Sequence, residues 1–253
     1  EIEPWLRSST PHAGLELLIA GRRWVVFFIT LTVIGSFFAM RRLLGEGLAF
    51  LAAVYVAADP FFIANSFELH PDGLLSGLFM LAALSFLAWI YGGGQRRYLV
   101  MSAIASGLAW LTKTPGIFLI TAVGLVALME ILVKRQPLRR TVLALVGWGL
   151  LALLTFVILW PAMWVNPLGT LSNMVAELVL YASGHINPNF FRGEITQDPG
   201  FLYYPFAYLL RVTPATLLGL ILAMPLLLMR KWPFSEPITR RTVYGLLVFA
   251  AVF

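Results

Sequence analysis

Cysteine is absent from the sequence, and charged residues are scarce. Without cysteine the chain has no disulfide framework and no thiol chemistry. Asp, Glu, Lys and Arg make up only 12% of the 253 residues, which is about half the share found in soluble domains. Hydrophobic residues make up 60%, more than one water-soluble core of this size can hide. The composition therefore predicts a polytopic membrane protein.

A cleavable signal peptide is also lacking at the start of the chain. The sequence begins Glu-Ile-Glu without a methionine and stops at Phe253 inside an apolar run. We therefore expect a fragment that is truncated at both ends.

Apolar runs long enough to cross a bilayer, at roughly 17 residues or more, recur along the whole chain. The expected fold class is all-α, a polytopic membrane helical bundle of about eight spans that forms one domain over residues 1–253. The candidate spans are 24–40, 47–66, 73–91, 98–112, 115–133, 141–165 and 212–229, with an incomplete one from 242.

The charged residues divide between alternate loops. Short turns on one side carry twelve of the 18 basic residues, and the positive-inside rule makes that side cytoplasmic. The other side receives residues 1–23, 67–72, 113 and 166–211, with all three histidines and most of the acids. The twelve basic residues are Arg41, Arg42, Arg96, Arg97, Lys134, Arg135, Arg139, Arg140, Arg230, Lys231, Arg240 and Arg241.

The long outward segment 166–211 has its own organisation. Asn166-Pro167 reads as a helix N-cap followed by proline at the first helical position. Apolar residues then recur at helical spacing, which predicts a helix lying along the membrane surface. The following loop, 184–200, is rich in turn formers and polar side chains.

Three titratable residues, Glu68, His70 and Asp72, lie together where the second and third spans meet. A carboxylate held at the outer interface can act as a general base or bind a polar substrate, which favours Asp72 as a catalytic residue. The alternative is that Asp72 only caps the helix that starts at Gly73. Glu68 and His70 could complete a proton relay or a metal site, but their spacing gives a metal no support.

Three cations lie at the depth of lipid headgroups on the same side. Lys113 occupies a tight outer turn, Arg211 interrupts an apolar stretch, and Arg22 precedes the first span. Each is a candidate to bind a phosphate. The alternatives are a snorkelling lysine and an arginine that merely anchors its helix.

Polar residues of the 184–200 loop are candidates to hold a sugar or a diphosphate. They include His185, Asn189 and Asp198. A solvated loop is the alternative, although loops of this length often carry function.

Four blocks of the sequence resemble glycosyltransferase family 39, the group of protein O-mannosyltransferases and aminoarabinose transferases of lipid A. They are "ADPFFIANSFELHPDGLLSGLFMLAALSFLAW", "SGLAWLTKTPGIFLI", "LWPAMWVNPLGTL" and "NFFRGEITQDPGFLYYPFAYLLRVTPATLLGL". The resemblance covers essentially the whole chain, and it depends on the order and spacing of the blocks.

The resemblance implies a C-type glycosyltransferase (GT-C) fold in the cell membrane, with its active site on the extracytoplasmic face. It implies transfer of a hexosyl or pentosyl group from a polyprenyl-phosphate-linked donor to an acceptor, usually with inversion. Asp72 matches an acidic residue of the family's catalytic cavity, and Lys113 falls in its "LTK" block. No cofactor beyond the lipid-linked donor is expected, and nucleic acid is not an expected partner.

One departure concerns the family's principal catalytic aspartate, which follows the first transmembrane helix. Residues 1–23 resemble the tail of that first outer loop, so the main base is expected to lie upstream of Glu1 and the fragment to be inactive alone. Asp72 would then assist that base, while Lys113, Arg211 and Arg22 bind the donor phosphate. His70, Glu68, His185, Asn189 and Asp198 would shape the sugar or acceptor pocket.

Two other classes of function are alternatives to a glycosyltransferase. A transporter or lipid flippase requires charged residues at mid-membrane depth and repeated halves, whereas the predicted spans are nearly free of charge and show no repeat. A non-catalytic membrane scaffold would not bind a lipid phosphate.

Overall fold

The computed structural model describes residues 13–67, 70–184, 189–196 and 200–252. These residues are mostly helical, with one short antiparallel hairpin, and the predicted all-α character is confirmed. Their contacts divide the chain into two compact units, residues 1–156 with 226–253, and residues 157–225.

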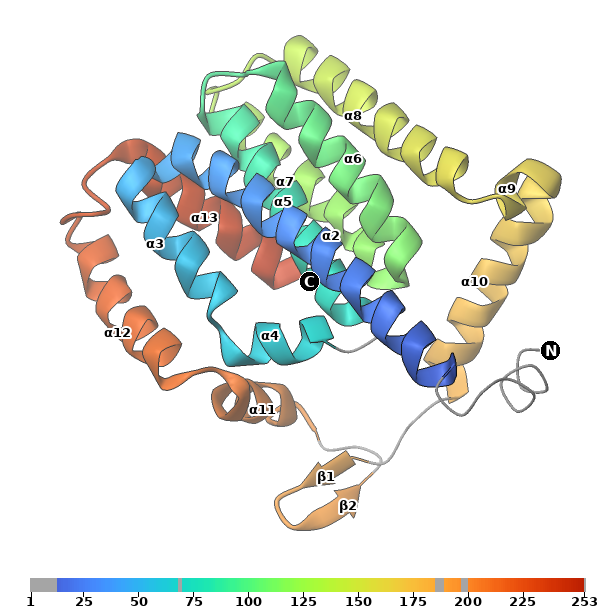
Figure 1. Cartoon of the computed structure of the whole chain (residues 1–253). Coiled ribbons are helices and arrows are strands. Elements are labelled where there is room, and N and C mark those ends of the chain that lie inside the picture. The colour runs from blue at the N-terminus through green and yellow to red at the C-terminus, as the bar shows by residue number, and fades with distance from the viewer. Residues whose placement is uncertain (1–12, 68–69, 185–188, 197–199, 253) are drawn as a thin grey trace. The chain divides into compact units, whose positions relative to one another are not determined.

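The first unit is a bundle of long helices joined by short turns (Figure 1). Its elements, in chain order, are α2 (Ala13–Leu44), α3 (Glu46–Ala57), α4 (Pro60–Phe67), α5 (Pro71–Tyr91), α6 (Arg96–Thr112), the 3₁₀ turn η1 (Thr114–Ile117), α7 (Phe118–Leu132), most of α8 (Leu138–Leu159) and α13 (Pro237–Val252).

Helix α5 is the centre of this bundle. Its most apolar stretch is 72% buried, against 11% for α2 and 17% for α8. Small residues let the neighbouring backbones approach α5 closely, as is usual between membrane helices. At Gly77, for example, a Cβ atom would collide with the Thr32 side chain of α2. The Ser102 hydroxyl of α6 donates a hydrogen bond to the Ala82 carbonyl of α5 at 2.9 Å.

The second unit contains shorter elements. They are α9 (Ala162–Val165), α10 (Pro167–Gly184), β1 (Asn189–Phe191), β2 (Glu194–Thr196), α11 (Tyr203–Arg211) and most of α12 (Pro214–Leu228). The predicted cap at Asn166 is confirmed, because its Oδ1 accepts a hydrogen bond from the Gly169 N–H at 3.0 Å. Strands β1 and β2 pair in antiparallel register around Arg192 and Gly193, which both have positive φ (55° and 93°), as a tight hairpin turn requires.

Eight spans are not confirmed. Among the described residues, four helices are long and apolar enough to cross a membrane, or up to six if each of two bent pairs counts as one span. Helices α6 and α13 have 17 and 16 residues and are too short to count. The first helix begins at Ala13, earlier than the expected residue 24, because Arg22 and Arg23 continue the helix instead of preceding it.

Two of the expected spans are interrupted at proline. The run 47–66 breaks between α3 and α4, whose axes differ by 55°. The run 141–165 ends at Leu159, just before Pro161, and the short helix α9 follows. Proline removes a backbone donor and disfavours helix in the residue before it, which explains both breaks.

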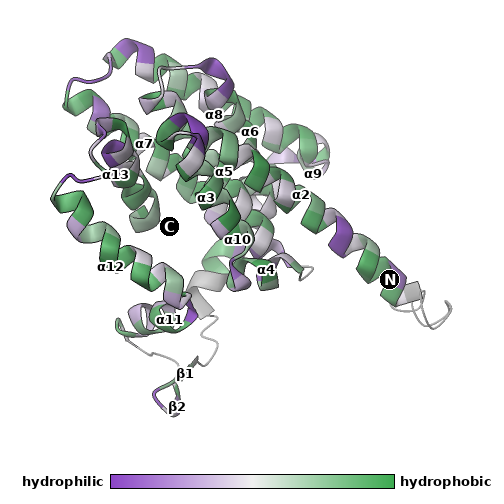
Figure 2. Cartoon of the chain, turned by 60° about the vertical axis from the view of Figure 1, so that its left-hand side comes forward, coloured by the Kyte–Doolittle hydropathy of each residue, from purple (hydrophilic) through white to green (hydrophobic). Residues whose placement is uncertain are grey.

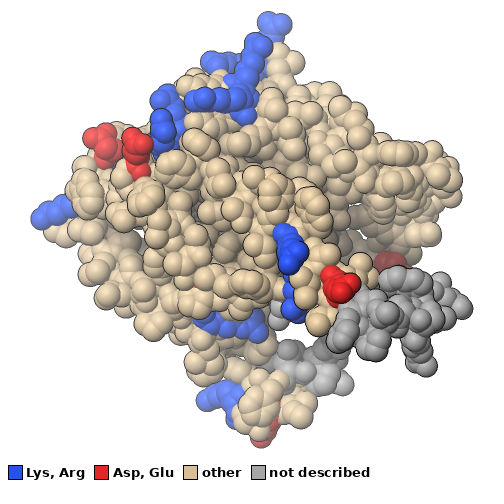
Figure 3. Space-filling view, in the orientation of Figure 1, with Lys and Arg blue, Asp and Glu red and all other residues tan. Residues whose placement is uncertain are grey.

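The turns that carry arginine meet at one end of the first unit. The Arg42 Nε donates to the Gly92 carbonyl at 2.7 Å, joining the last turn of α2 to the α5–α6 turn. The Gln136 amide donates to the Ile90 carbonyl at 3.0 Å, joining the α7–α8 turn to the same place. We call this the arginine end. Figure 3 shows a group of Lys and Arg atoms along the upper edge of the view.

Hydrophobic residues predominate along the helices, and hydrophilic residues are concentrated mainly at the turns (Figure 2). Large side chains such as Phe28 and Leu150 are 49% and 63% exposed. So many exposed large apolar side chains indicate contact with lipid rather than water.

Candidate active site

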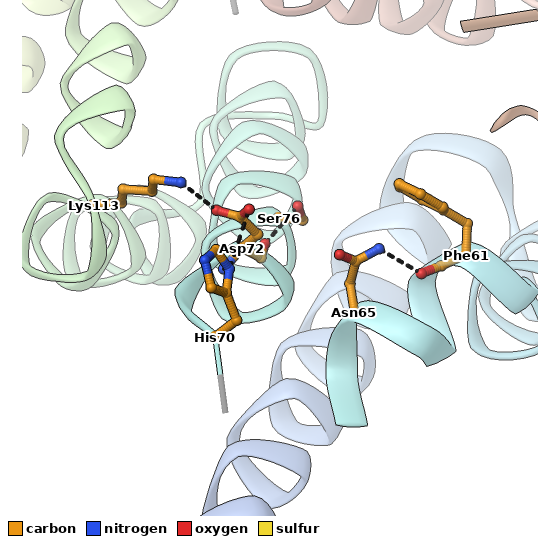
Figure 4. Close-up of polar contacts among 6 residues, drawn as sticks. All are labelled: Phe61, Asn65, His70, Asp72, Ser76 and Lys113. Carbon is orange, nitrogen blue, oxygen red and sulfur yellow. Dashed lines mark hydrogen bonds and ion pairs between the residues drawn. The ribbon is translucent and has the colours of Figure 1, made fainter. Parts of the chain in front are cut away.

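Asp72 and Lys113 form an ion pair at the end of the first unit opposite the arginine end. The Lys113 ammonium lies 2.7 Å from Asp72 Oδ1 (Figure 4). Asp72 belongs to the first turn of α5, and Lys113 ends α6 in an extended conformation. Antiparallel packing of α5 on α6 brings these two residues together across 41 positions of sequence.

His70 joins the pair from the other side. Its Nδ1 lies 3.2 Å from Asp72 Oδ2 and 3.4 Å from the Asp72 backbone nitrogen. Nδ1 can accept the Asp72 N–H or, when protonated, donate to Oδ2, but it cannot do both. The carboxylate therefore has an ammonium on one oxygen and an imidazole beside the other.

The alternative reading of Asp72 as a helix cap is wrong. The capping residue of α5 is His70, whose side chain accepts from the Asp72 N–H, and Pro71 holds the first helical position. Asp72 is therefore free of the capping role, and its carboxylate is directed to Lys113 instead. The pair does sit at the positive N-terminal end of the helix dipole, which favours an anion there.

A cleft of about 390 Å³ opens beside the pair, within the range of small-molecule sites. Its walls come from the end of α3, from α4 and from the first turns of α5. They combine the polar residues Asp59, Asn65, Asp72 and Ser76 with apolar and aromatic side chains, among them Tyr55, Phe61 and Phe62.

Gly73 sets the width of this cleft. A Cβ atom at Gly73 would lie 2.6 Å from the Asn65 carbonyl oxygen, so only glycine lets α4 approach α5 this closely. The close approach places Asn65 across from Asp72, as Figure 4 shows. The Asn65 amide donates to the Phe61 carbonyl at 2.8 Å, which leaves its side-chain oxygen available to a ligand.

Asp59 was not among the residues predicted for the site. Its Oδ1 accepts the Phe62 N–H at 2.8 Å and so caps α4 after the helix break. The signal was present in the sequence, since an Asp-Pro pair inside an apolar run is typical of a new helix start.

The ion pair is half exposed, and its electrostatic stabilisation is small. The side chains of Lys113 and Asp72 are 41% and 45% exposed. Pairs of this exposure contribute about 0–1 kcal/mol to stability. A bound anion or hydroxyl can therefore displace one partner from the other at little cost.

The remaining candidate residues belong to other elements or lie outside the described residues. Arg22 is exposed on α2 and Arg211 is the exposed last residue of α11, in the second unit. Asn189 begins β1, where its backbone pairs with Thr196. Glu68, His185 and Asp198 lie outside the described residues.

The described residues of this site do not form a group of metal ligands. Among the described ranges no group of three or more His, Asp or Glu side chains is arranged to hold a metal ion. Of the described residues at the ion pair, His70 and Asp72 offer two ligands, fewer than a typical zinc site uses.

A bundle of long apolar helices, with a cleft of mixed polar and apolar lining at one end, is typical of an integral membrane protein. Residues 16–160 match the profile of the dolichyl-phosphate-mannose-protein mannosyltransferase family. The match covers more than half of the chain, so the protein belongs to this family of membrane glycosyltransferases. It includes Asp59, His70, Asp72 and Lys113, while Arg211 and the 184–200 loop lie beyond it. No curated protein and no solved structure shows significant similarity to the chain.

Proposed function

We propose that the protein transfers a sugar from a polyprenyl-phosphate-linked donor to an acceptor on the extracytoplasmic face of the cell membrane. The observation that carries this proposal is the Asp72–Lys113 pair beside the cleft. The pair supplies a carboxylate for the acceptor and an ammonium for the donor phosphate, which are the two charges that such a transfer needs. Family membership supports the same class of reaction.

In the proposed reaction an acceptor hydroxyl loses its proton to a carboxylate and attacks the anomeric carbon of the sugar. The bond between that carbon and the donor phosphate breaks, and the lipid phosphate leaves with the bonding electrons. Asp72 orients the hydroxyl or takes its proton, alone or beside a further carboxylate. Lys113 stabilises the negative charge that grows on the leaving phosphate.

The ion pair also defines the state of the site before a donor binds. Without donor, the ammonium neutralises Asp72 at 2.7 Å. An arriving phosphate offers Lys113 a competing partner and releases the carboxylate for the acceptor. Because the pair is half exposed, this exchange requires little free energy.

The other candidate residues have supporting roles in this proposal. Arg22 and Arg211 add positive charge for the donor phosphate, and His70 holds the Asp72 carboxylate in place. The sugar or acceptor is bound by Glu68, His185, Asn189 and Asp198. The cleft walls formed by Tyr55, Phe61 and Phe62 suit a ligand with both polar and apolar faces.

The orientation follows from charge. The arginine end faces the cytoplasm under the positive-inside rule, so the Asp72–Lys113 pair faces outward. A donor lipid then reaches the cleft from the outer leaflet.

The test is transfer of a radiolabelled sugar from polyprenyl phosphate by the full-length protein in liposomes. We expect Asp72→Asn and Lys113→Ala each to lower turnover at least about 100-fold, the low end of the effect of a positioned acid, base or charge. Glu46→Gln and Lys231→Ala are matched controls, since both remove an exposed charge away from this site.

Thermal unfolding of the same variants distinguishes a loss of catalysis from a loss of stability. The lost pair should change the free energy of unfolding by no more than about 1 kcal/mol. Wild-type turnover in either site variant would contradict the assigned role of that residue.

A further inference from the structure

A second cavity lies at the arginine end, far from the candidate active site along the helices. It is a groove of about 450 Å³ between α6 and α8, two helices that run in the same direction. The groove has apolar walls, including Leu99, Leu143 and Leu151, and Trp148 forms part of its lining. The indole N–H of Trp148 is already satisfied by the Ser102 hydroxyl at 3.0 Å, so this part of the lining offers no free donor.

Two arginines stand at the mouth of this groove. Arg96 and Arg140 both line it, and neither guanidinium group has a hydrogen bond or ion pair to another described residue. The Arg140 guanidinium packs over the α5–α6 turn, where a Cβ atom at Gly94 would lie 2.6 Å from its Nη2. An apolar channel that ends in unpaired guanidinium groups suits a molecule with an apolar tail and an anionic head.

A smaller polar pocket of about 250 Å³ adjoins the groove and shares Trp89, Gly94 and Arg140 with it. Arg135 and Arg241 also line this pocket. Both lie near the buried Glu130, which pairs with Arg241 and lies 3.7 Å from Arg135. The pocket is therefore lined by three guanidinium groups, and the one nearby carboxylate lies close to only two of them. The remaining excess of positive charge suits an anion.

The groove has the length of one membrane leaflet. Arg140 and Leu151 are eleven residues apart on α8, which corresponds to about 16 Å at the rise of an α-helix. Half of a hydrocarbon core is about 15 Å. A lipid with its phosphate at Arg140 would therefore place an acyl chain along the whole groove.

We propose that this groove and its adjoining pocket bind an anionic phospholipid from the leaflet at the arginine end, with one acyl chain along α8 and the phosphate between Arg140, Arg96 and Arg135. The site is independent of the proposed transfer reaction. Its occupant would fill the loosely packed seam between α6 and α8.

The experiment is a titration of the full-length protein in nonionic detergent with dioleoyl phosphatidylglycerol, with bound lipids counted by native mass spectrometry. Zwitterionic dioleoyl phosphatidylcholine and soluble glycerol phosphate serve as comparison ligands. Two variants test the two halves of the site. Arg140→Gln removes the head contact, and Gly147→Leu fills the groove, where a Cβ atom at Gly147 meets nothing within 4 Å.

Each variant has a matched control on the same helix. Arg139→Gln removes an adjacent exposed charge that lines neither cavity, and Gly149→Leu adds the same side chain at a glycine that is equally open but outside the groove. Because none of the four changes removes a buried side chain, all four variants should fold, which thermal unfolding checks.

We expect Arg140→Gln and Gly147→Leu to weaken phosphatidylglycerol binding about tenfold or more, as loss of a charged hydrogen bond or of a buried chain segment does. The two controls should stay within about twofold of wild type. Equal weakening by Arg139→Gln, unchanged binding in Gly147→Leu, or equal binding of phosphatidylcholine would each overturn the proposal. Competition by glycerol phosphate as strong as by the lipid would overturn it too, since only an ion would then be bound.

Discussion

At the residue scale, the contact between Lys113 and Asp72 is what the sequence did not predict. Both residues were predicted for the site, but for separate tasks and from separate turns. Their 41 positions of separation carry no local pattern, because a contact between the ends of antiparallel helices depends on the packing between them. The role of His70 as the cap of α5 was also missed, since the Asp before Gly73 is the commoner capping residue.

A double substitution that exchanges the two charges tests whether the pair takes part in the reaction or only holds α5 and α6 together. Asp72→Lys with Lys113→Asp keeps two opposite charges in contact, so stability should stay within about 1 kcal/mol of wild type. Activity should remain at least about 100-fold down, because the carboxylate then leaves the cleft wall that Asp72 lines. The measurements are radiolabelled sugar transfer and thermal unfolding. Recovery of turnover in the double variant would show that the residues serve packing alone.

At the element scale, hydropathy located the apolar runs but not their breaks. Runs 73–91 and 115–133 correspond closely to α5 and to η1 with α7. The run 47–66 is interrupted because Asp59 caps a new helix at Pro60, and an apolar window averages over one polar residue. That break matters for the site, since α4 turns there to form a wall of the cleft.

Element packing also explains a charge inside a predicted span. Glu130 lies in α7 and its side chain is only 6% exposed. It pairs with Arg241 of α13, whose guanidinium lies 4.6 Å from the centre of the Tyr91 ring. This contact between α7, α13 and α5 joins distant parts of the chain at the arginine end, and no local sequence pattern predicts the pairing.

Loss of this pair should weaken the bundle. Glu130→Gln leaves Arg241 without its anion, and we expect a loss of about 3 kcal/mol, the low end for a broken buried pair because Arg241 remains 27% exposed. Thermal unfolding in detergent measures the loss. Glu46→Gln is the control, because its pair with Arg41 is 3.9 Å long and well exposed, so at most about 1 kcal/mol is expected. Equal stability of the two variants would mean that Glu130 does not hold α7 to α13.

At the scale of the whole molecule, the distribution of charges predicted the two ends of the bundle better than hydropathy predicted the number of spans. The sequence placed arginine turns on one side and His70, Asp72 and Lys113 on the other, and the first unit brings each set to its own end. On α2 alone, Arg22 and Arg41 are nineteen residues apart, about 28 Å of helix, close to the thickness of a hydrocarbon core. The predicted number of spans was not confirmed. Hydropathy averages apolar character over a whole run, whereas the end of a helix depends on single residues such as Pro60.

The orientation of these two ends is testable because the chain contains no cysteine. A single cysteine can report its compartment without background labelling. Phe67→Cys marks the end that carries Asp72, at a side chain that is 59% exposed, and Arg139→Cys marks the arginine end at an exposed site.

In intact cells, a membrane-impermeant maleimide should label Phe67→Cys and leave Arg139→Cys unlabelled until the membrane is permeabilised. The physical reason is that arginine-rich turns are retained on the cytoplasmic side during insertion, which in the proposed orientation leaves the cleft outside. The cysteine-free protein controls for nonspecific labelling, and full labelling of both variants after permeabilisation controls for accessibility. The reverse pattern would place the Asp72–Lys113 pair in the cytoplasm, out of reach of a donor lipid in the outer leaflet, and the proposed extracytoplasmic transfer would fall with it.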